Sequence, residues 1–346
     1  MSSQTMQAAV LAAPGKIEVK KLPLPQPGPG EVLLRVRACG ICGSDLHFYH
    51  GVLPARPGVP LGHEFAGEVA GLGPGVEGWQ QGQHVAVEPV VVCQRCQYCM
   101  RGDRRLCQQR RLMGALIPGG MAEYIAVPAY TLHPLPADLD FRLAALLEPL
   151  SVVGHALHLA GLQANERVLV LGSGSIGLLA SVVASSQGAE VTCTYRYPHQ
   201  GEAALALGVA EAISADDEGS RRLNLKARES PFDLIVESVG GSGDTFQQAV
   251  GLARPGGRVA LLGLFARPVN VSIFSLMMKE VRLLASSGYC HSGQDSDFSV
   301  SLALLQTQPD QFLRLATHTF PLSRAADAFA TATDKRQGSL KVQLEL

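Results

Sequence analysis

Residues 166–195 read ERVLVLGSGSIGLLASVVASSQGAEVTCTY, and this stretch decides the fold of the second half of the chain. A run of apolar, β-branched residues leads into a glycine-rich turn, an apolar segment of helical length follows, and a second β-branched run begins after Gly188. Three more strand-like runs follow, at 232–240, 257–263 and 280–287. Helical segments such as 243–257 lie between them. Alternating strands and helices predict an α/β fold with a doubly wound parallel sheet.

The glycine-rich turn has the spacing G-x-G-x-x-G. Gly172 and Gly174 let the chain turn tightly and approach a pyrophosphate, and Gly177 lets the following helix pack closely on the strand. Ser175 and Ile176 open that helix, whose first N–H groups then face the anion. A strand, a helix and the next strand all stand at the expected distances around the motif. The sequence therefore predicts a dinucleotide-binding site.

Before residue 143 the chain has a different pattern of apolar and turn-forming residues. Short apolar runs alternate with Pro- and Gly-rich turns, as in LPLPQPGPGE, and EVLLRVRACG, FAGEVAGLG and AEYIAVPA have the pattern of strands. The last part mixes helical segments with a closing strand, LKVQLEL. We therefore expect two domains: 153–290 forms the dinucleotide-binding domain, and 1–152 together with 291–346 forms a β-rich domain.

The composition limits the classes of partner. Basic and acidic residues nearly balance, with 29 Lys and Arg against 30 Asp and Glu, so nucleic acid is not an expected partner. The N-terminus lacks a charged flank followed by a long apolar run, and no stretch reaches the apolar length that spans a bilayer. We expect a cytoplasmic protein that does not enter a membrane and that acts on a small molecule.

Four of the eight cysteines stand close together in CQRCQYCMRGDRRLC. Cys93, Cys96, Cys99 and Cys107 can close a tetrahedral zinc site that has no open position. Such a site stabilises the fold and offers no place for a substrate. An iron–sulfur cluster is the competing interpretation, but the seven-residue step before the last cysteine and the lack of a second cluster motif disfavour it.

A second group of metal-binding residue types comes from two motifs, GICGSDLH and GHEFAGEV. Cys42, His63 and Glu64 could hold a zinc ion and leave one position open, which is the arrangement of a catalytic metal. The alternative is a buried thiol beside a polar turn. Glu148, in LEPLSV, is flanked by apolar residues, and a metal would account for it better than a place at the start of a helix. Cys39 follows Ala38, which ends a strand-like run, and Cys39 is therefore expected in the core.

These motifs, in this order, resemble those of the zinc-dependent medium-chain dehydrogenase/reductase family, most closely its sorbitol (polyol) and threonine dehydrogenase branch. The match covers essentially the whole chain. It implies a chaperonin-10-like β-barrel catalytic domain, a Rossmann domain, two zinc ions per chain and hydride transfer between an alcohol and a nicotinamide cofactor. By the resemblance, Cys42, His63 and Glu64 match the catalytic zinc ligands. Glu148 matches a glutamate that approaches or replaces a ligand as the zinc moves.

Ser44 and His47 lie two and five residues after Cys42. If Cys42 is a metal ligand, a hydroxyl and an imidazole at these positions can carry a proton from a substrate alcohol to solvent. The resemblance also matches both residues to the proton relay of the family.

In that family the second strand of the Rossmann domain usually ends in an aspartate that binds the ribose hydroxyls of the adenosine. Here the position is Tyr195, Arg196 follows it, and no acid stands between Glu190 and Glu202. A carboxylate would repel a 2′-phosphate, whereas a guanidinium binds one well. The sequence therefore favours NADP(H) over NAD(H). The alternative is a solvated basic turn, with the ribose bound in another way.

The leading hypothesis is a zinc-dependent, NADP(H)-preferring oxidoreductase that interconverts a secondary alcohol or polyol and the corresponding ketone. An NAD-linked sorbitol- or threonine-type dehydrogenase is the alternative. A dinucleotide-binding structural protein without turnover would lack ligands of the first metal site, and all of them are present. The resemblance also predicts a homodimer or homotetramer.

Overall fold

The computed structural model describes residues 4–241, 244–289, 291–292 and 295–346. The chain divides into two compact units, one of residues 1–148 with 290–346 and the other of residues 149–289. None of the helices in the described ranges has the length and apolar character of a membrane-spanning segment.

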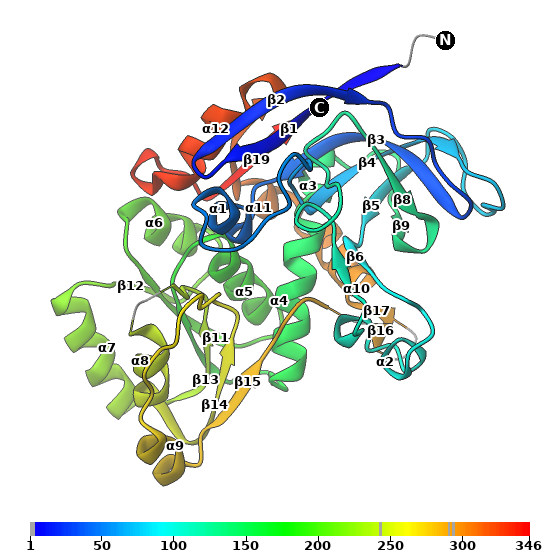
Figure 1. Ribbon diagram of the computed structural model, residues 1–346. Helices are drawn as coiled ribbons and strands as arrows, with labels where there is room; N and C mark the ends of the chain where they lie inside the picture. The colour runs from blue at the N-terminus through cyan, green and yellow to red at the C-terminus, as the bar shows by residue number, and fades with distance from the viewer. Residues whose placement is uncertain (1–3, 242–243, 290, 293–294) are drawn as a thin grey trace. The chain divides into compact units, whose positions relative to one another are not determined.

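The unit of residues 149–289 contains a parallel sheet of six strands, with helices between the strands (Figure 1). Its order is β12-β11-β10-β13-β14-β15. The elements are, in chain order, β10 (Arg167–Leu171), α5 (Ser175–Ser186), β11 (Glu190–Tyr195), α6 (Pro198–Ala206), β12 (Glu211–Ser214), α7 (Asp217–Glu229), β13 (Phe232–Glu237), α8 (Thr245–Leu252), β14 (Ala253–Leu261), α9 (Ile273–Lys279) and β15 (Arg282–Ala285). The predicted doubly wound sheet is confirmed.

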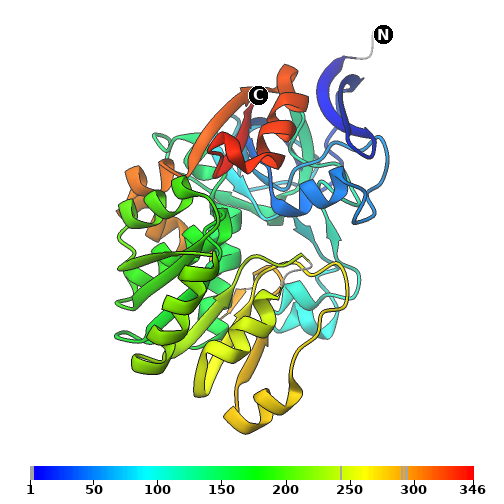
Figure 2. The ribbon, with the colours of Figure 1, turned by 90° about the vertical axis from the view of Figure 1, so that its left-hand side faces the viewer.

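The strand order of this sheet reverses at β10. The chain moves outward from β10 to β12, then returns to β13 and moves outward in the other direction. Because parallel crossovers are right-handed, α5 and α6 lie on one face of the sheet and α8 and α9 on the other (Figure 2). Ligands of such sheets bind beyond the carboxyl ends of the strands at this reversal, between β10 and β13.

The predicted helical segment 243–257 was wrong in extent. Its first residue lies outside the described ranges, and α8 ends at Leu252, where β14 begins directly. Pro255 has no N–H to donate within a helix, and the two glycines after it also disfavour one. These residues instead enter the sheet, in which β14 pairs with both β13 and β15.

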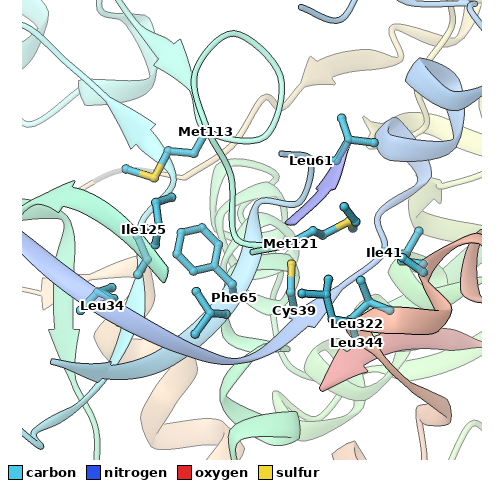
Figure 3. Packing of buried hydrophobic residues seen from close by; sticks show 14 of the residues in the cluster. Leu34, Cys39, Ile41, Leu61, Phe65, Met113, Met121, Ile125, Leu322 and Leu344 are labelled. Atoms are coloured by element: carbon cyan, nitrogen blue, oxygen red, sulfur yellow. The ribbon is translucent and has the colours of Figure 1, made fainter. Parts of the chain in front are cut away.

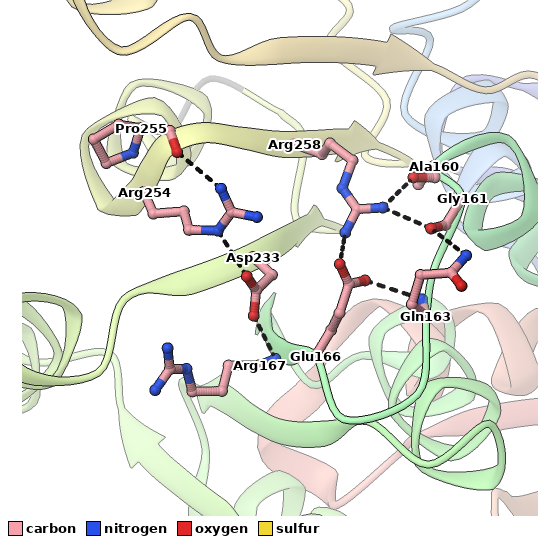
Figure 4. A network of polar contacts seen from close by, with 9 residues as sticks. All are labelled: Ala160, Gly161, Gln163, Glu166, Arg167, Asp233, Arg254, Pro255 and Arg258. Atoms are coloured by element: carbon pink, nitrogen blue, oxygen red, sulfur yellow. Dashed lines mark hydrogen bonds and ion pairs between the residues drawn. The ribbon is translucent and has the colours of Figure 1, made fainter.

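Arg258 joins β14 to the end of α4 (Leu147–Leu159) (Figure 4). Its buried guanidinium donates from Nη1 to the carbonyl oxygens of Ala160 and Gly161, each at 2.7 Å. Its Nη2 pairs with Glu166, just before β10. The last carbonyl groups of a helix have no partner within the helix, and a cation there satisfies them. Arg258 thus fixes the chain where it enters the sheet.

We expect Arg258→Met to lower the free energy of unfolding by about 3–5 kcal/mol, because it leaves the Glu166 carboxylate and two carbonyl groups without their partner. Arg254→Met, in the same strand, is the matched control. Arg254 pairs with Asp233, but its side chain is 38% exposed, so the expected loss is about 1 kcal/mol or less. Urea unfolding followed by circular dichroism measures both variants. Equal losses would contradict the role given to Arg258.

The other unit is built on a seven-stranded sheet with the order β18-β19-β3-β4-β5-β9, and β8 pairs with β3 outside this path. The elements before residue 149 are β1 (Thr5–Ala13), β2 (Lys16–Pro23), β3 (Glu31–Gly40), α1 (Gly43–Tyr49), β4 (Glu64–Leu72), β5 (His84–Val87), β6 (Val90–Val91), α2 (Gln97–Met100), β7 (Arg111–Leu112), β8 (Tyr124–Pro128), β9 (Leu132–Pro134) and α3 (Phe141–Ala144). Those near the C-terminus are α10 (Asp297–Thr307), α11 (Pro309–Leu313), β18 (Ala316–Pro321), α12 (Ala325–Thr333) and β19 (Lys341–Glu345).

The strands of this sheet enclose an apolar core (Figure 3). Leu34 and Cys39 enter it from β3, Phe65 from β4, Ile125 from β8 and Leu344 from β19. The Cys39 side chain is fully buried, as the sequence predicted. Because β19 pairs antiparallel with β3, the last strand of the chain lies beside the strand that leads into α1.

Candidate functional site

Cys42, His63 and Glu64 lie together in the unit that contains the seven-stranded sheet. One ligand atom from each residue lies within 4.8 Å of the other two. Cys42 is the N-cap of α1, just after β3, and Glu64 begins β4 opposite Gly40 of β3. A Cβ on Gly40 would lie 2.2 Å from Glu64 Oε2, so the carboxylate can occupy this place only beside a glycine. The pairing of β3 with β4 therefore brings the two motifs together.

The surroundings of His63 suit a metal ligand. Its Nδ1 lies 3.6 Å from Asp45 Oδ1, and its Nε2 lies 3.4 Å from Ser44 Oγ. Asp45 is fully buried, and its Oδ2 accepts a hydrogen bond from the Cys42 N–H. A carboxylate behind the far ring nitrogen orients a metal-binding histidine and raises its basicity. Burial by itself would lower the pKa of His63, but the charges of Asp45 and Cys42 outweigh burial and raise it.

Two residues of this cluster were not predicted from the sequence. Asp45 stands inside the GICGSDLH motif, and its place between Cys42 and His47 was an available signal. Lys341 Nζ lies 2.7 Å from each carboxylate oxygen of Glu64, and both side chains are buried. The available signal for Lys341 was weaker: it is the one lysine of the closing strand, LKVQLEL.

Glu148 lies near this cluster, in the first turn of α4, and is 8% exposed. It is not one of the described residues whose ligand atoms meet within 4.8 Å. Desolvation raises the pKa of Glu148 to about 7; His63 opposes this shift and the charge of Glu64 adds to it. The structure therefore brings three of the four expected residues into contact range and leaves Glu148 beside them.

Ser44 and His47 lie three residues apart on α1, so they share one side of the helix. Ser44 Oγ is next to His63, as described above, whereas His47 is half-buried. Desolvation and the neighbouring His50 lower the pKa of His47, so its imidazole is neutral at pH 7 and can accept a proton. The helix thus presents a hydroxyl at the cluster and a neutral base one turn away.

The four remaining predicted ligands meet in the loop between β6 and β7, which pair with each other. The sulfur atoms lie 3.9 Å apart for Cys93 and Cys99, 3.5 Å for Cys96 and Cys99, and 3.6 Å for Cys107 and Cys93. Four sulfurs, each about 2.3 Å from one tetrahedral zinc ion, are about 3.8 Å apart, so these thiols fit a single ion. Backbone N–H groups of Arg95 and Cys96 lower the pKa of Cys93 to about 6, which favours the thiolate that binds metal.

The glycine-rich turn lies between β10 and α5 and suits a pyrophosphate. Gly172 has a φ of 91°, which favours glycine, and a Cβ on Gly177 would lie 1.8 Å from the Gly172 carbonyl oxygen. A Cβ on Gly174 would meet nothing within 4 Å. Gly174 is the N-cap of α5 and has no side chain to cap the helix, and Ser175 and Ile176 form its first turn. An anion can therefore approach this helix N-terminus.

Three buried polar atoms without a hydrogen-bond partner among the described residues lie along the carboxyl edge of the six-stranded sheet. They belong to His199 (Nε2), which comes after β11, to Glu237 (Oε2), the last residue of β13, and to Ser286 (Oγ), which comes after β15. Buried polar atoms are rarely left unpaired, so this edge suits a polar ligand such as a dinucleotide.

The turn after β11 has a defined shape. The ring of Tyr195 packs on Gly201, where a Cβ would lie 2.7 Å from two ring carbons. Arg196 is exposed, and its guanidinium carbon lies 5.7 Å from the ring centroid of Tyr197. Gln200 Oε1 accepts hydrogen bonds from the N–H groups of Arg196 and Tyr197, each at 3.2 Å. This amide oxygen therefore stabilises the turn and is not free to bind a cofactor.

Two family models match the chain. The model described as "Alcohol dehydrogenase GroES-like domain" matches residues 28–137, and the one described as "Zinc-binding dehydrogenase" matches residues 175–307. Sorbitol dehydrogenase of Halalkalibacterium halodurans is 33% identical over 319 residues, which are 91% of this chain and 92% of that protein. The chain belongs to the zinc-containing medium-chain alcohol dehydrogenase family. It is a zinc-dependent dehydrogenase that acts on alcohols with a nicotinamide cofactor.

Solved structures agree with this placement of the dehydrogenase. A zinc-binding dehydrogenase from Sinorhizobium meliloti bound to NADP has a TM-score of 0.89 and 30% identity, and the match covers 99% of this chain and 100% of that one. An alcohol dehydrogenase from Escherichia coli CFT073 with NADH has a TM-score of 0.89 and 29% identity, with 99% of each chain covered. The predicted fold class, a GroES-like domain with a Rossmann-like sheet, is confirmed.

Proposed function

We propose that this dehydrogenase interconverts a secondary alcohol or polyol and the corresponding ketone, and that it prefers NADP(H) to NAD(H). The observation that carries the preference is the turn after β11, where Tyr195 and Arg196 stand in place of a ribose-binding acid. One solved relative holds NADP and another holds NADH, so family membership leaves the choice to local residues. The sorbitol dehydrogenase relative supports a polyol or another secondary alcohol as the substrate class.

In the proposed site Cys42, His63 and Glu64 would hold a zinc ion, and Glu148 beside them would offer a further carboxylate. A zinc ion bound there supplies Lewis-acid polarisation of the substrate oxygen. The four-cysteine loop holds the second, structural ion. The burial of His63 and Glu64 supports this role, because a low-dielectric setting strengthens electrostatic interactions with the substrate.

The residues of α1 move the proton in this proposal. Ser44 Oγ accepts the hydroxyl proton of the substrate alcohol and passes its own proton toward His47. The lowered pKa of His47 supports this order, because a neutral imidazole accepts the proton at pH 7. In the other unit, the N-terminus of α5 and the turn at Gly172 and Gly174 bind the cofactor pyrophosphate.

Arg196→Ala tests the cofactor preference. We expect NADPH binding to weaken about 10–100-fold, because a charged hydrogen bond contributes about 1.5–3 kcal/mol, while NADH binding changes little. The purified protein is titrated with each cofactor separately, at one ionic strength, with fluorescence as the readout. Arg221→Ala, which removes an exposed arginine of α7, is the matched control and should leave both affinities unchanged. Equal or tighter binding of NADH by the wild type would contradict the preference and favour an NAD-linked polyol dehydrogenase.

The proposed assembly is a homodimer or homotetramer. Strand β15 is at the edge of the six-stranded sheet, where one side of its backbone has no neighbouring strand in the described chain. Helix α9 exposes four large apolar side chains, each at least 60% exposed: Ile273, Phe274, Met277 and Met278. An open strand edge and an apolar patch of this kind support contact with a second copy.

A further inference from the structure

Lys341 and Glu64 form a buried ion pair at the edge of the candidate metal site. The two side chains are 2% and 0% exposed, and Lys341 Nζ lies 2.7 Å from both carboxylate oxygens. The ammonium also lies 3.4 Å from the carbonyl oxygen of Ile41, the residue before Cys42. Taking two charges out of water is costly, so a pair this deeply buried must be held in one geometry.

The pair confines the Glu64 carboxylate from two directions. On one side is the backbone of β3, where the missing Cβ of Gly40 leaves just enough room. On the other side is Lys341, which takes one lone pair on each oxygen. A carboxylate has about four lone-pair positions, so one on each oxygen stays available for a metal. The carboxylate is therefore held in place and still has a lone pair on each oxygen for a metal ion.

The negative charges around the site also favour a buried cation. Cys42, Asp45, Glu64 and Glu148 can each carry a negative charge, and the last three are buried. A divalent ion compensates for two of these charges, and Lys341 compensates for a third. Without the ammonium, the Glu64 carboxylate would face the other acids with no partner opposite it, and it would turn away from the position that Lys341 now holds.

We propose that Lys341 is a positioning residue of the catalytic metal site, which fixes the Glu64 carboxylate as a ligand, so that the last strand of the chain completes the site. The proposal rests on the proposed function, because it assumes a metal at Cys42, His63 and Glu64. Residues that hold a ligating carboxylate typically change metal affinity about 10–100-fold when they are replaced.

The test compares wild type, K341M and K341Q, each loaded with zinc and washed free of excess. Zinc per chain is measured by mass spectrometry, and zinc release to a colorimetric chelator is followed over time. We expect the wild type to hold two ions, and K341M to release one of them about 10–100-fold faster while the other leaves at the wild-type rate. Release of both ions from K341M at wild-type rates would overturn the proposal.

K279M is the control, because the partly buried Lys279 of α9 likewise donates to backbone carbonyl oxygens, those of Val250, Gly251 and Ala253. It should lose stability but release zinc at the wild-type rates. If circular dichroism shows that K341M is unfolded, K341Q is the test variant, since it removes the charge and keeps a hydrogen-bond donor. Release of both zinc ions from K341Q at the wild-type rates would then overturn the proposal. A wild type that binds only one ion, in the cysteine loop, would instead show that the proposed catalytic metal site is wrong.

Discussion

Replacing Cys42 with serine is expected to lower kcat/KM by about a thousandfold or more and to reduce the zinc content from two ions per chain to one. A serine hydroxyl stays protonated at neutral pH, so the variant keeps only His63 and Glu64 of the three clustered ligands. Metal catalysis contributes several kcal/mol, and about 1.4 kcal/mol is tenfold in rate. Steady-state kinetics and zinc analysis on the same preparation measure both effects.

Cys39→Ala is the matched control for this variant. Cys39 lies three residues earlier, at the end of β3, but its side chain is in the apolar core and belongs to neither group of candidate ligands. Its replacement should lower stability by about 1 kcal/mol and leave both zinc ions and the kinetics in place. Near-normal turnover in Cys42→Ser, with two ions still bound, would rule out Cys42 as a ligand of the catalytic metal.

The six-stranded sheet could be predicted because its local signals agree with one another. The strand β10, the glycine at 172 and the apolar helix α5 each favour the same strand–turn–helix unit. Pro255 and the two glycines after it indicate that the helix ends before them, but the exact boundary at Ala253 could not be predicted, because alanine and arginine fit either a helix or a strand. Pairing of β14 with its two neighbours decides the matter there, and such pairing depends on residues far away in the sequence.

The candidate metal site shows the same limit. Cys42, His63 and Glu64 could be predicted because each is a ligand type within a compact motif. Lys341 could not, because its partner Glu64 lies 277 positions away and a lysine in a strand is usually exposed. The antiparallel pairing of β19 with β3 brings the start of β19 close to the end of β3, and there Lys341 contacts the buried carboxylate.

Cys107→Ser is expected to lose the structural zinc ion and to make the loop between β6 and β7 more susceptible to cleavage by trypsin. The strands β6 and β7 have two residues each and α2 has four, and the backbone hydrogen bonds between Cys96 and Arg110 join residues that are near neighbours within the loop itself. Structural zinc sites contribute folding energy directly, and three thiolates close the site poorly. The loop contains five trypsin sites, Arg95, Arg101, Arg104, Arg105 and Arg110. We expect cleavage there to become about tenfold faster or more, with zinc content falling from two ions to one.

The effect should be local, because the loop is only one part of its unit and the apolar core of that unit draws on β3, β4, β8 and β19. Mass spectrometry of the fragments should therefore place the early cuts between residues 95 and 111, while the far-ultraviolet circular dichroism stays close to that of the wild type. Cys193→Ala, in β11, is the matched control: Cys193 is buried and belongs to neither candidate metal group, so both ions and the resistance to trypsin should remain. Equal cleavage of Cys107→Ser and wild type, with two ions in each, would mean that the loop is held by its own packing and that zinc is not its structural support.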